Sequence, residues 1–580
     1  MTDTAAAASP TERLDDLVHA SLARSTRALS VVSPGLALAD WALHLALSPG
    51  RCMQLGTLAL QMARAWAEHA AASARAALPL FGGTPPEPVQ PDRRFAAAAW
   101  QRWPFNVWQQ AFVLQERWWA EATGPTWGVE KHHSDLVGFW ARQWLDVTSP
   151  ANLPATNPLV LERAAQEGGA NFLRGVQDWA DDLRRANRGE PPAGTEAFQV
   201  GRNLATTPGQ VVWRNPLMEL IQYAPQTATV QAEPVLIVPA WIMKYYILDL
   251  APGSSLVEHL VQQGHTVFAI SWKNPGEAER DLGMDDYLQR GIAEALQAIA
   301  AIVPRQKVHG VGYCLGGTLL TIAAAALARD GDARLASLTL FAAQTDFSDP
   351  GELGLFIDES QLSLLEAQMK QTGYLRADQM AGAFQMLRSY DLLWSRLVQD
   401  YLLGERAPLN ALMAWNADAT RMPARMHGDY LRQLFLRNDL AEGRYRAQGR
   451  PVALNDLQLP VYLVGTETDH VAPWRSVYKL HHLCTAEIRF VLTSGGHNAG
   501  VVNPPGEGHR HYRAATAAPG QGYVAPDDWL AATPTTEGSW WPDWCRWLAA
   551  RSGPPVKPPG LGAKAAPVLG DAPGSYVMEH

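Results

Sequence analysis

The chain has 580 residues, of which 47% are hydrophobic and 18% are charged, and its net charge is −9. This length exceeds one ordinary hydrophobic core and favours two domains, while the composition favours a folded chain over a disordered one. The negative charge and the lack of a long basic run argue against a nucleic-acid partner. The four cysteines are scattered, which argues against a disulfide framework and a cysteine zinc site and favours a reducing compartment.

The first residues give no sign of export. The segment "MTDTAAAASPTERLDD" lacks a basic region followed by an apolar one, so we expect no signal peptide. No uncharged apolar run reaches the about 18 residues that a membrane-spanning helix needs. These two observations predict a cytoplasmic protein without a membrane span.

Residues 1–200 are predicted to be mainly helical. Segments such as "RCMQLGTLALQMARAWAEHAAASARAAL" repeat apolar residues at spacings of three and four, which is typical of amphipathic helices. The proline- and glycine-rich stretch "FGGTPPEPVQPDRR" interrupts this pattern. We therefore expect a helical N-terminal domain over residues 1–200.

Residues 201–580 show a different pattern, in which apolar strand-like runs alternate with helical segments. Such alternation predicts a parallel sheet that is covered on both faces. The helix-like region of about 350–450 interrupts the alternation and is expected to form a cap inserted between two late strands. Residues 552–568 are rich in proline and glycine and are expected to form a loose tail. The predicted strands are Pro234–Trp241, Thr266–Trp272, Leu335–Phe347, Pro460–Asp469 and Glu487–Gly496.

One short turn carries the strongest chemical signal. The stretch "VHGVGYCLGGTLL" leads from a predicted strand through Cys314 into a predicted helix, with Gly312, Gly316 and Gly317 around the cysteine. This is the pattern of a nucleophile elbow, in which glycines leave room for a sharp strand-to-helix reversal. The reversal exposes the nucleophile above the sheet, and the positive end of the following helix favours a thiolate.

Two other interpretations compete for this turn. A lone cysteine is often a buried structural residue. Gly310–Gly312 also resembles part of a nucleotide-binding loop. Such a loop, however, follows the first strand of its domain, and an acidic residue ends the next strand about 20 positions later. Here the turn follows a third or later strand, and no acidic residue ends a strand at that distance. The nucleophile elbow is therefore the favoured interpretation.

An elbow nucleophile acts with an acid and then a histidine, both later in the chain and at strand ends. Asp469 in "VGTETDHVAPW" and His497 in "SGGHNAG" meet this requirement. We expect Asp469 to orient His497, which takes the proton of Cys314. An aspartate at such a place can also be a turn or helix-capping residue. Asp346, at the end of the preceding strand, is the alternative acid, and His470 is expected to have a packing or hydrogen-bonding role.

The oxyanion of an acyl-transfer reaction needs two backbone N–H donors. The first is expected from Leu315, the residue after the nucleophile, and the second from Ile242 in the loop after the strand that ends in "VPAWI". Pairs of histidines could suggest a metal site, but no cysteines or spaced carboxylates accompany them, so we expect no metal. These pairs are His132/His133, His481/His482 and His509/His511.

Several motifs together resemble the single-subunit polyhydroxyalkanoate (polyhydroxybutyrate) synthases. They include "GYCLGGT", "GTETDHVAPW", "GGHNAGVVNPP", "SPANLPATNP", "MAWNADATRMP" and "GSYVMEH", and the resemblance covers about residues 90–580. It implies an α/β-hydrolase core in the α/β class with a helical cap, preceded by the helical domain. It also implies that Cys314 carries the acyl group and that Trp415 lines the pocket under the cap. Met243 stands where relatives often have asparagine, and is expected at the substrate entrance.

By this resemblance the protein polymerises (R)-3-hydroxyacyl-CoA thioesters into polyester and releases CoA through an acyl-cysteine intermediate. A thiolate exchanges readily with a thioester, and the cap would exclude water from the acylated cysteine. No cofactor is expected, because CoA is part of the substrate and a product. The expected partners are the 3-hydroxyacyl-CoA, the surface of a nascent polyester granule in the cytoplasm, and a second copy in a homodimer. The N-terminal domain would serve dimerisation and granule contact.

Other functions on this fold and outside it stay open at this point. A thioesterase or a polyester depolymerase would use the same three residues with water as the acceptor. A catalytically silent granule-associated protein would need none of them, and the presence of cysteine, aspartate and histidine in the required order argues against it.

Overall fold

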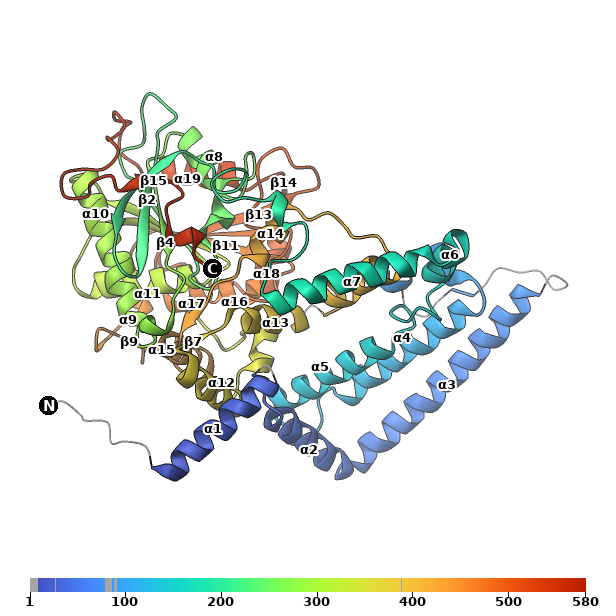
Figure 1. Cartoon of the computed structure of the whole chain (residues 1–580). Helices are drawn as coiled ribbons and strands as arrows, with labels where there is room; N and C mark the ends of the chain where they lie inside the picture. The colour runs from blue at the N-terminus through green and yellow to red at the C-terminus, as the bar shows by residue number, and fades with distance from the viewer. Residues whose placement is uncertain (1–8, 27, 79–85, 88–90, 388) are drawn as a thin grey trace. The chain divides into compact units, whose positions relative to one another are not determined.

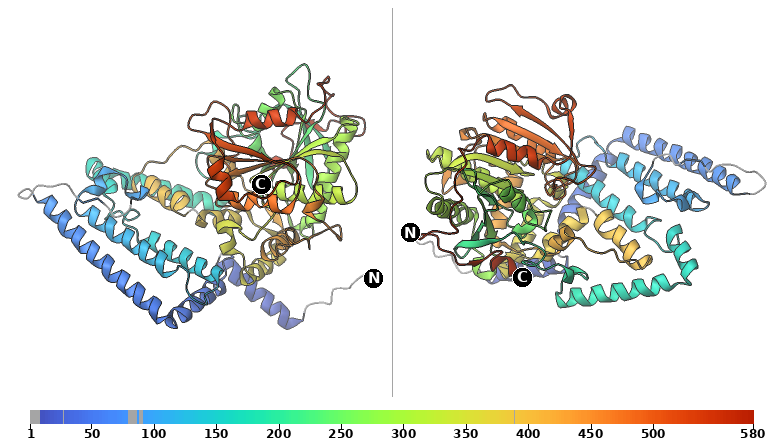
Figure 2. Two further views of the ribbon diagram at one scale, coloured as in Figure 1. Left: turned by 180° about the vertical axis from the view of Figure 1, so that it is seen from behind. Right: turned by 90° about the horizontal axis from the view of Figure 1, so that it is seen from above.

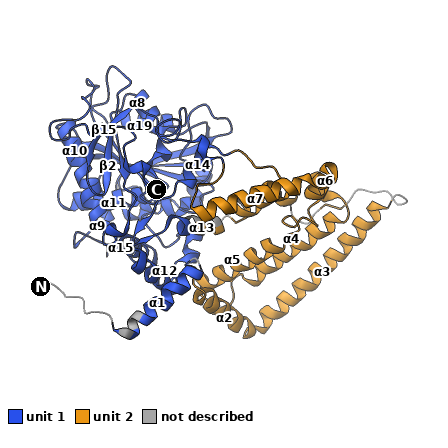
Figure 3. Ribbon diagram, viewed as in Figure 1, with its two compact units in different colours: residues 1–28, 194–381, 409–580 blue, residues 29–193, 382–408 orange. Residues whose placement is uncertain are grey.

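The computed structural model describes the chain except for residues 1–8, 27, 79–85, 88–90 and 388 (Figure 1). The chain divides into two compact units, which Figure 3 shows in different colours. The sheet unit comprises residues 1–28, 194–381 and 409–580, and the helical unit comprises residues 29–193 and 382–408. Residues 382–408 therefore group with the helical unit, although the chain on both sides of them belongs to the sheet unit.

The helical unit consists mainly of long helices, which Figure 2 shows from two further sides. Its core joins aromatic and aliphatic side chains, among them Phe95, Trp100, Phe112 and Leu145. The prediction of a mainly helical N-terminal region is confirmed. The α-helices of this unit are α2 (Val32–Ala46), α3 (Pro49–Ala77), α4 (Phe105–Ala122), α5 (Lys131–Thr148), α6 (Pro158–Glu167) and α7 (Ala170–Arg188), and its short helices are η1 (Arg93–Phe95), η2 (Ala98–Gln101), η8 (Tyr390–Trp394) and η9 (Leu397–Leu402).

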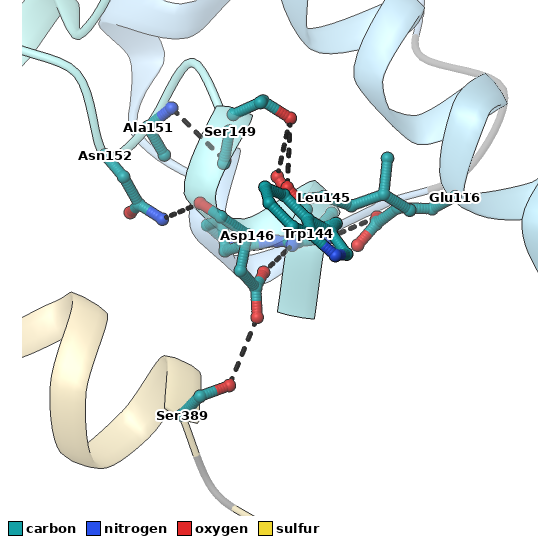
Figure 4. Close-up of polar contacts among 11 residues, drawn as sticks. Glu116, Trp144, Leu145, Asp146, Ser149, Ala151, Asn152 and Ser389 are labelled. Carbon is teal, nitrogen blue, oxygen red and sulfur yellow. Dashed lines mark hydrogen bonds and ion pairs between the residues drawn. The ribbon is translucent and has the colours of Figure 1, made fainter. Parts of the chain in front are cut away.

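A partly buried ionic cluster lies inside the helical unit. The guanidinium of Arg94 forms ion pairs with the carboxylates of Asp92, Glu116 and Asp146. The hydroxyl of Ser389 donates a hydrogen bond of 3.2 Å to Asp146 (Figure 4). Ser389 lies 243 residues after Asp146 in the chain, so this contact holds the inserted segment to the helices that precede the sheet.

Polar side chains of helix α7 bind the same inserted segment, residues 382–408. The Asn171 side chain donates to the carbonyl of Leu402, and the hydroxyl of Tyr401 donates to Asp182. Gly175 permits the close approach, because a Cβ atom there would lie 1.8 Å from the carbonyl oxygen of Tyr401. These contacts explain why residues 382–408 group with α7 rather than with the sheet.

The sheet unit is built on one sheet of eleven strands in the order β14-β13-β12-β11-β6-β5-β3-β4-β2-β1-β15. The six strands from β12 to β4 are parallel, whereas the strands outside them pair antiparallel. The strands are β1 (Gly209–Arg214), β2 (Met218–Tyr223), β3 (Val235–Val238), β4 (Val267–Trp272), β5 (Val308–Tyr313), β6 (Leu335–Phe341), β11 (Val461–Thr466), β12 (Ile488–Thr493), β13 (His511–Ala517), β14 (Thr535–Glu537) and β15 (Gly570–Asp571).

The expected parallel sheet is thus confirmed for the centre and extended by antiparallel strands at both edges. The central strands are buried along their whole length, which is why they appear in the sequence as continuous apolar runs. The helices between and after these strands are α8 (Leu256–Gln262), α9 (Met284–Asp286), η6 (Tyr287–Ala293), α10 (Glu294–Ile302), α11 (Leu315–Arg329), α16 (Trp474–Tyr478), α17 (Leu480–Leu483), α18 (Pro526–Ala532) and α19 (Trp541–Ala549).

The expected helical insertion lies between β6 and β11, which are neighbours in the sheet. The first helix of the chain, α1 (Pro10–Ser25), packs on α12 of this insertion: Arg24 donates to Gln371, and Lys370 pairs with Asp16 at 2.6 Å. The helices of the insertion outside the helical unit are α12 (Glu359–Thr372), α13 (Ala377–Leu387), α14 (Ala411–Ala417), α15 (Ala424–Tyr430) and η10 (Leu431–Leu436). Of these, α13 extends into the helical unit.

The segment that was expected to be a loose tail is bound to the sheet unit, so that prediction is wrong. The backbone of Val556 exchanges hydrogen bonds with that of Val230. The side chain of Gln222, on β2, bonds to the backbone of both Gly560 and Gly562. Prolines and glycines here prevent a regular strand, but the backbone of Val230 and the side chain of Gln222 satisfy backbone groups of this segment instead.

Within the part of the chain that the structure describes, no helix is both long enough and apolar enough to span a lipid bilayer.

Candidate active site

Cys314 stands where strand β5 ends and helix α11 begins. Its backbone has φ 52° and ψ −125°, a conformation that a residue with a side chain adopts only under strain. The residue is buried, with 9% of its surface exposed, and its thiol is free. This is the geometry that the glycine pattern around Cys314 predicts.

The glycines around Cys314 are required by close contacts. A Cβ atom on Gly312 would lie 2.3 Å from the Cα atom of Gly317. A Cβ atom on Gly316 would lie 2.1 Å from the carbonyl oxygen of Val238, at the end of the neighbouring strand β3. No side chain fits at either position, because these distances are far below van der Waals contact.

Asp469 and His497 lie beyond the ends of β11 and β12 and form a hydrogen-bonded pair. The Nδ1 atom of His497 is 2.8 Å from Oδ2 of Asp469, and the carboxylate is fully buried. Backbone N–H groups of Val471 and Ala472 donate to the other carboxylate oxygen, at 2.9 Å each. The carboxylate is therefore fixed from both sides and holds one ring nitrogen of His497.

The electrostatics favour a charged pair. Burial disfavours the imidazolium of His497, but Asp469 and then Cys314, including a hydrogen bond to each, outweigh burial and raise its pKa well above the ordinary value. Burial likewise opposes the carboxylate of Asp469, but His497 and the backbone donors lower its pKa overall. The structure thus brings Cys314, His497 and Asp469 together in the order predicted, with His497 in the middle.

The alternative acid makes other contacts. Asp346 accepts hydrogen bonds from Ser348 at 2.5 and 2.8 Å and from the side chain of Asn438 at 3.0 Å. These bonds fix the turn that follows β6, so Asp346 is used as a turn residue. His470 is half-buried, and its carbonyl accepts the N–H of Glu352.

The two expected oxyanion donors lie on adjacent segments. Leu315 is the first residue of α11, and the close approach of Gly316 to Val238 places that helix end against the loop that follows β3. Ile242 is buried in this loop, and the hydroxyl of Thr420 donates to the preceding carbonyl, that of Trp241. Leu315 is thus adjacent to Cys314, and Ile242 lies in the loop that follows the neighbouring strand β3, while their role as oxyanion donors stays a prediction.

Trp415 and Met243 also come together. Trp415, on α14, is buried to 3% exposure, and its indole N–H donates a 2.8 Å hydrogen bond to the carbonyl of Lys244. Met243 forms an isolated antiparallel bridge with Ala419. The insertion is therefore fastened to the loop after β3, and α14 reaches the loop of His497 through Asn416, whose side chain contacts that of Asn498.

The histidine pairs that could have suggested a metal make separate contacts. His133 pairs with Asp40 and His511 with Glu467, whereas His481 contacts the carbonyl of Tyr478. Among the described residues, no group of three or more histidine, cysteine, aspartate or glutamate side chains is arranged to hold a metal ion.

Some residues at the site are not evident from the sequence. The hydroxyl of Thr466 donates to Asp469 at 2.9 Å, and that of Tyr313 donates to Asn498 at 2.6 Å. Tyr430, on α15, lies close enough to Cys314 to be affected by its charge. Thr466 and Asn498 could have been suggested by their positions beside Asp469 and His497, but no local signal marks Tyr430.

Comparison with known proteins identifies the family. Residues 91–260 match the family model of the poly-beta-hydroxybutyrate polymerase (PhaC) N-terminus, residues 9–51 match that of the poly-beta-hydroxybutyrate polymerase N terminal, and residues 233–504 match the alpha/beta hydrolase fold. The chain is 42% identical to the poly(3-hydroxyalkanoate) polymerase of Methylorubrum extorquens over 85% of this chain and 81% of that protein. It is 38% identical to the poly(3-hydroxyalkanoate) polymerase subunit PhaC of Cupriavidus necator, over 84% of this chain and 83% of that one. The sheet unit thus has the α/β-hydrolase fold, and the chain belongs to the poly(3-hydroxyalkanoate) polymerase family.

Proposed function

We propose that the protein polymerises (R)-3-hydroxyacyl-CoA thioesters into polyhydroxyalkanoate through an acyl group held on Cys314. The observation that carries this proposal is the contact of His497 with both Cys314 and Asp469 at the nucleophile elbow. The names of the relatives support the class of product. A thiol with a neighbouring imidazole and a buried carboxylate is suited to acyl transfer.

The first step transfers the acyl group from CoA to the protein. The thiol of Cys314 gives its proton to His497, and its sulfur attacks the carbonyl carbon of the thioester. The N–H groups of Leu315 and Ile242 stabilise the negative oxygen that forms. The bond between this carbon and the sulfur of CoA then breaks, and CoA leaves as a thiol with the proton from His497.

The second step forms the ester. The 3-hydroxyl of another unit gives its proton to His497, and its oxygen attacks the carbonyl carbon bound to Cys314. The carbon–sulfur bond breaks, and Cys314 recovers its proton from His497. Asp469 keeps the same nitrogen of His497 protonated throughout and stabilises the imidazolium. The insertion that carries Trp415 would exclude water, which competes with the hydroxyl for the same thioester.

The proposed chemistry needs no cofactor beyond the substrate, since CoA enters as part of the thioester and leaves as a product. The polymer would form a separate phase, so we expect the protein at the surface of cytoplasmic polyester granules, with the helical unit in contact with the polymer. A homodimer is expected as well. These partners and this location are inferences from the proposed product.

The test is to incubate the protein with 3-hydroxybutyryl-CoA and to measure free CoA thiol, polymer and free 3-hydroxybutyrate. Polymer with little free acid is the expected result. Free acid as the main product would support a thioesterase instead, and hydrolysis of added polyester would support a depolymerase. No CoA release at all would agree with a silent granule-associated protein and contradict the proposal.

Cys314→Ala should abolish polymer formation and CoA release, with a loss of about 10⁴-fold or more. Cys484→Ala is the matched control, because Cys484 is also a buried free cysteine but burial alone dominates its environment and raises the pKa of its thiol. Retention of more than a few per cent of the activity in folded Cys314→Ala, or an equal loss in the control, would contradict the assignment of the nucleophile.

A further inference from the structure

A phenol from the insertion packs against the segments that follow strands β3 and β6. Strand β5 runs between β3 and β6, and the three strands are parallel, with Val238 level with Gly312 and Tyr313 level with Phe341. Trp241 follows β3, Phe347 follows β6, and Cys314 follows β5 between them. A residue that touches both Trp241 and Phe347 therefore bridges the segments that follow the two strands on either side of Cys314.

Tyr430 is such a residue. Its ring centroid is 6.2 Å from that of Trp241 and 6.2 Å from that of Phe347, in edge-to-face arrangements with both. Phe435 closes a third side at 5.2 Å. Tyr430 is only 6% exposed, so these three rings hold the phenol in one place.

The hydroxyl of Tyr430 is free to bind a ligand. It has no hydrogen-bond partner among the residues that the structure describes, and no hydrogen bond joins it to Cys314. Burial, with an additional contribution from the charge of Cys314, raises the pKa of the phenol well above its ordinary value. The group consequently stays protonated and is a hydrogen-bond donor close enough to Cys314 to be affected by its charge.

An acyl group on Cys314 would extend from the sulfur with its atoms in a defined order. Its carbonyl oxygen belongs on the side of Leu315 and Ile242, at the start of α11. The oxygen on its third carbon is a few bonds further from the sulfur, on the side of the insertion. We propose that the Tyr430 hydroxyl binds this third-carbon oxygen and selects 3-hydroxyacyl over plain acyl thioesters, an inference that rests on the proposed function.

The experiment compares the first turnover of 3-hydroxybutyryl-CoA with that of butyryl-CoA, followed by CoA release and by the mass of the acylated protein. Butyryl-CoA has no hydroxyl and stops after one transfer, so it reports acylation alone. Wild type should be acylated faster by the hydroxylated thioester. Tyr430→Phe should lower that rate about tenfold and leave the butyryl rate unchanged, because a site built to bind a hydroxyl discriminates through that bond.

Tyr287→Phe is the matched control. Tyr287 is also buried and contacts Trp241, with ring centroids 5.5 Å apart, but burial and the acidic residues Glu279 and Asp286 set its pKa rather than Cys314. Its loss should leave the ratio of the two rates as in wild type.

Equal slowing of both thioesters in folded Tyr430→Phe, or an unchanged ratio, would overturn the inference. The wild-type rates test the inference even if the variant fails to fold. Acylation of wild type by butyryl-CoA as fast as by 3-hydroxybutyryl-CoA would show that no group binds the third-carbon oxygen. A wild type that releases CoA from neither thioester would overturn the proposed function together with this inference.

Discussion

Each unit of the molecule buries an aspartate beside a cationic side chain, and the two aspartates behave in opposite ways. In the helical unit, Asp146 contacts Arg94 at 3.2 Å, and in the sheet unit, Asp469 contacts His497 at 2.8 Å. Burial raises the pKa of Asp146 above its ordinary value, although Arg94 opposes this. The pKa of Asp469 is lowered, although burial works against it.

The other neighbours of the two carboxylates explain this difference. Asp146 shares Arg94 with Asp92 and Glu116, and the negative charge of Asp92 adds to burial in raising its pKa. The carboxylate of Asp469 pairs with His497, which also interacts with Cys314 but forms no ion pair with a second carboxylate among the described residues. It also accepts hydrogen bonds from two backbone N–H groups and from the hydroxyl of Thr466, all of which stabilise the charged form.

The cation decides what each cluster can do. A guanidinium does not lose its proton under ordinary conditions, so the Arg94 cluster can hold chain segments together but cannot transfer a proton. An imidazole exchanges its proton within the accessible pH range. Two clusters that each pair a carboxylate with a cation are thus suited to different tasks, one to structure and one to chemistry.

The largest effect is expected from Asp469→Asn. The amide would leave the imidazolium of His497 without its counter-charge and allow the wrong tautomer, so CoA release should fall about 10³- to 10⁴-fold in folded protein. Asp346→Asn, in the turn after β6, is the control and should retain most activity. A greater loss in the control than in Asp469→Asn would assign the acid to Asp346.

Arg94→Met should affect stability rather than chemistry. It leaves Asp92, Glu116 and Asp146 buried without their cation, and the free energy of unfolding should fall by about 3–5 kcal/mol. Chemical denaturation followed by circular dichroism measures the loss. Arg64→Met is the control, because Arg64 pairs with Glu68 on the surface, where such a pair contributes little. Similar midpoints for both variants would contradict a structural role for the cluster.

The pH dependence of stability should have opposite signs in the two clusters. The raised pKa of Asp146 contributes stability that is complete below the unfolded value of 3.8 and is lost as the pH rises through the folded pKa. The lowered pKa of Asp469 contributes stability that is present above 3.8 and is lost as the pH falls through the folded pKa.

The free energies of unfolding of wild type, Asp146→Asn and Asp469→Asn, measured at pH values on both sides of 3.8, test these opposite pH dependences. Relative to wild type, Asp146→Asn should become more stable as the pH rises above 3.8, because the variant has no buried charge to form. Asp469→Asn should lose its disadvantage as the pH falls. The same direction of change in both variants would contradict the comparison.

The smallest effect is expected from Ser389→Ala, which removes one hydrogen bond to Asp146. The free energy of unfolding should fall by about 1 kcal/mol, and the rate of CoA release should remain as in wild type. Ser348→Ala, whose hydroxyl bonds to Asp346 in the sheet unit, is a control for the loss of a serine hydroxyl elsewhere. A loss of activity in Ser389→Ala at unchanged stability would mean that the segment around it contributes to the reaction.

What could be predicted from the sequence is what depends on local geometry. The glycines beside Cys314 predict the elbow, because the turn brings backbone atoms so close to them that no side chain fits there. The central strands are evident as apolar runs because both of their faces are buried. Asp469 and His497 follow such strands, so their order along the chain was enough to select them.

What could not be predicted depends on contacts between distant segments. Tyr430 of the insertion packs on Trp241 after β3 and on Phe347 after β6, and no periodicity in the sequence indicates these contacts. The edge strand β15 and the segment around Val556 lack the apolar run of a buried strand. Their positions depend on backbone hydrogen bonds to β1 and to Val230, which are distant in the sequence. The attachment of residues 382–408 to the helical unit is another such case, because it rests on single polar contacts such as that of Ser389.

This attachment has a consequence for synthesis on the ribosome. The helices of residues 29–193 emerge first, yet Ser389, which bonds to Asp146, follows that aspartate by 243 residues. At typical rates of translation, this separation corresponds to about 10–50 seconds. During that time the polar side of α7 and the Arg94 cluster lack the segment that completes them. The nascent helical unit therefore lacks these contacts until residues 382–408 have been synthesised.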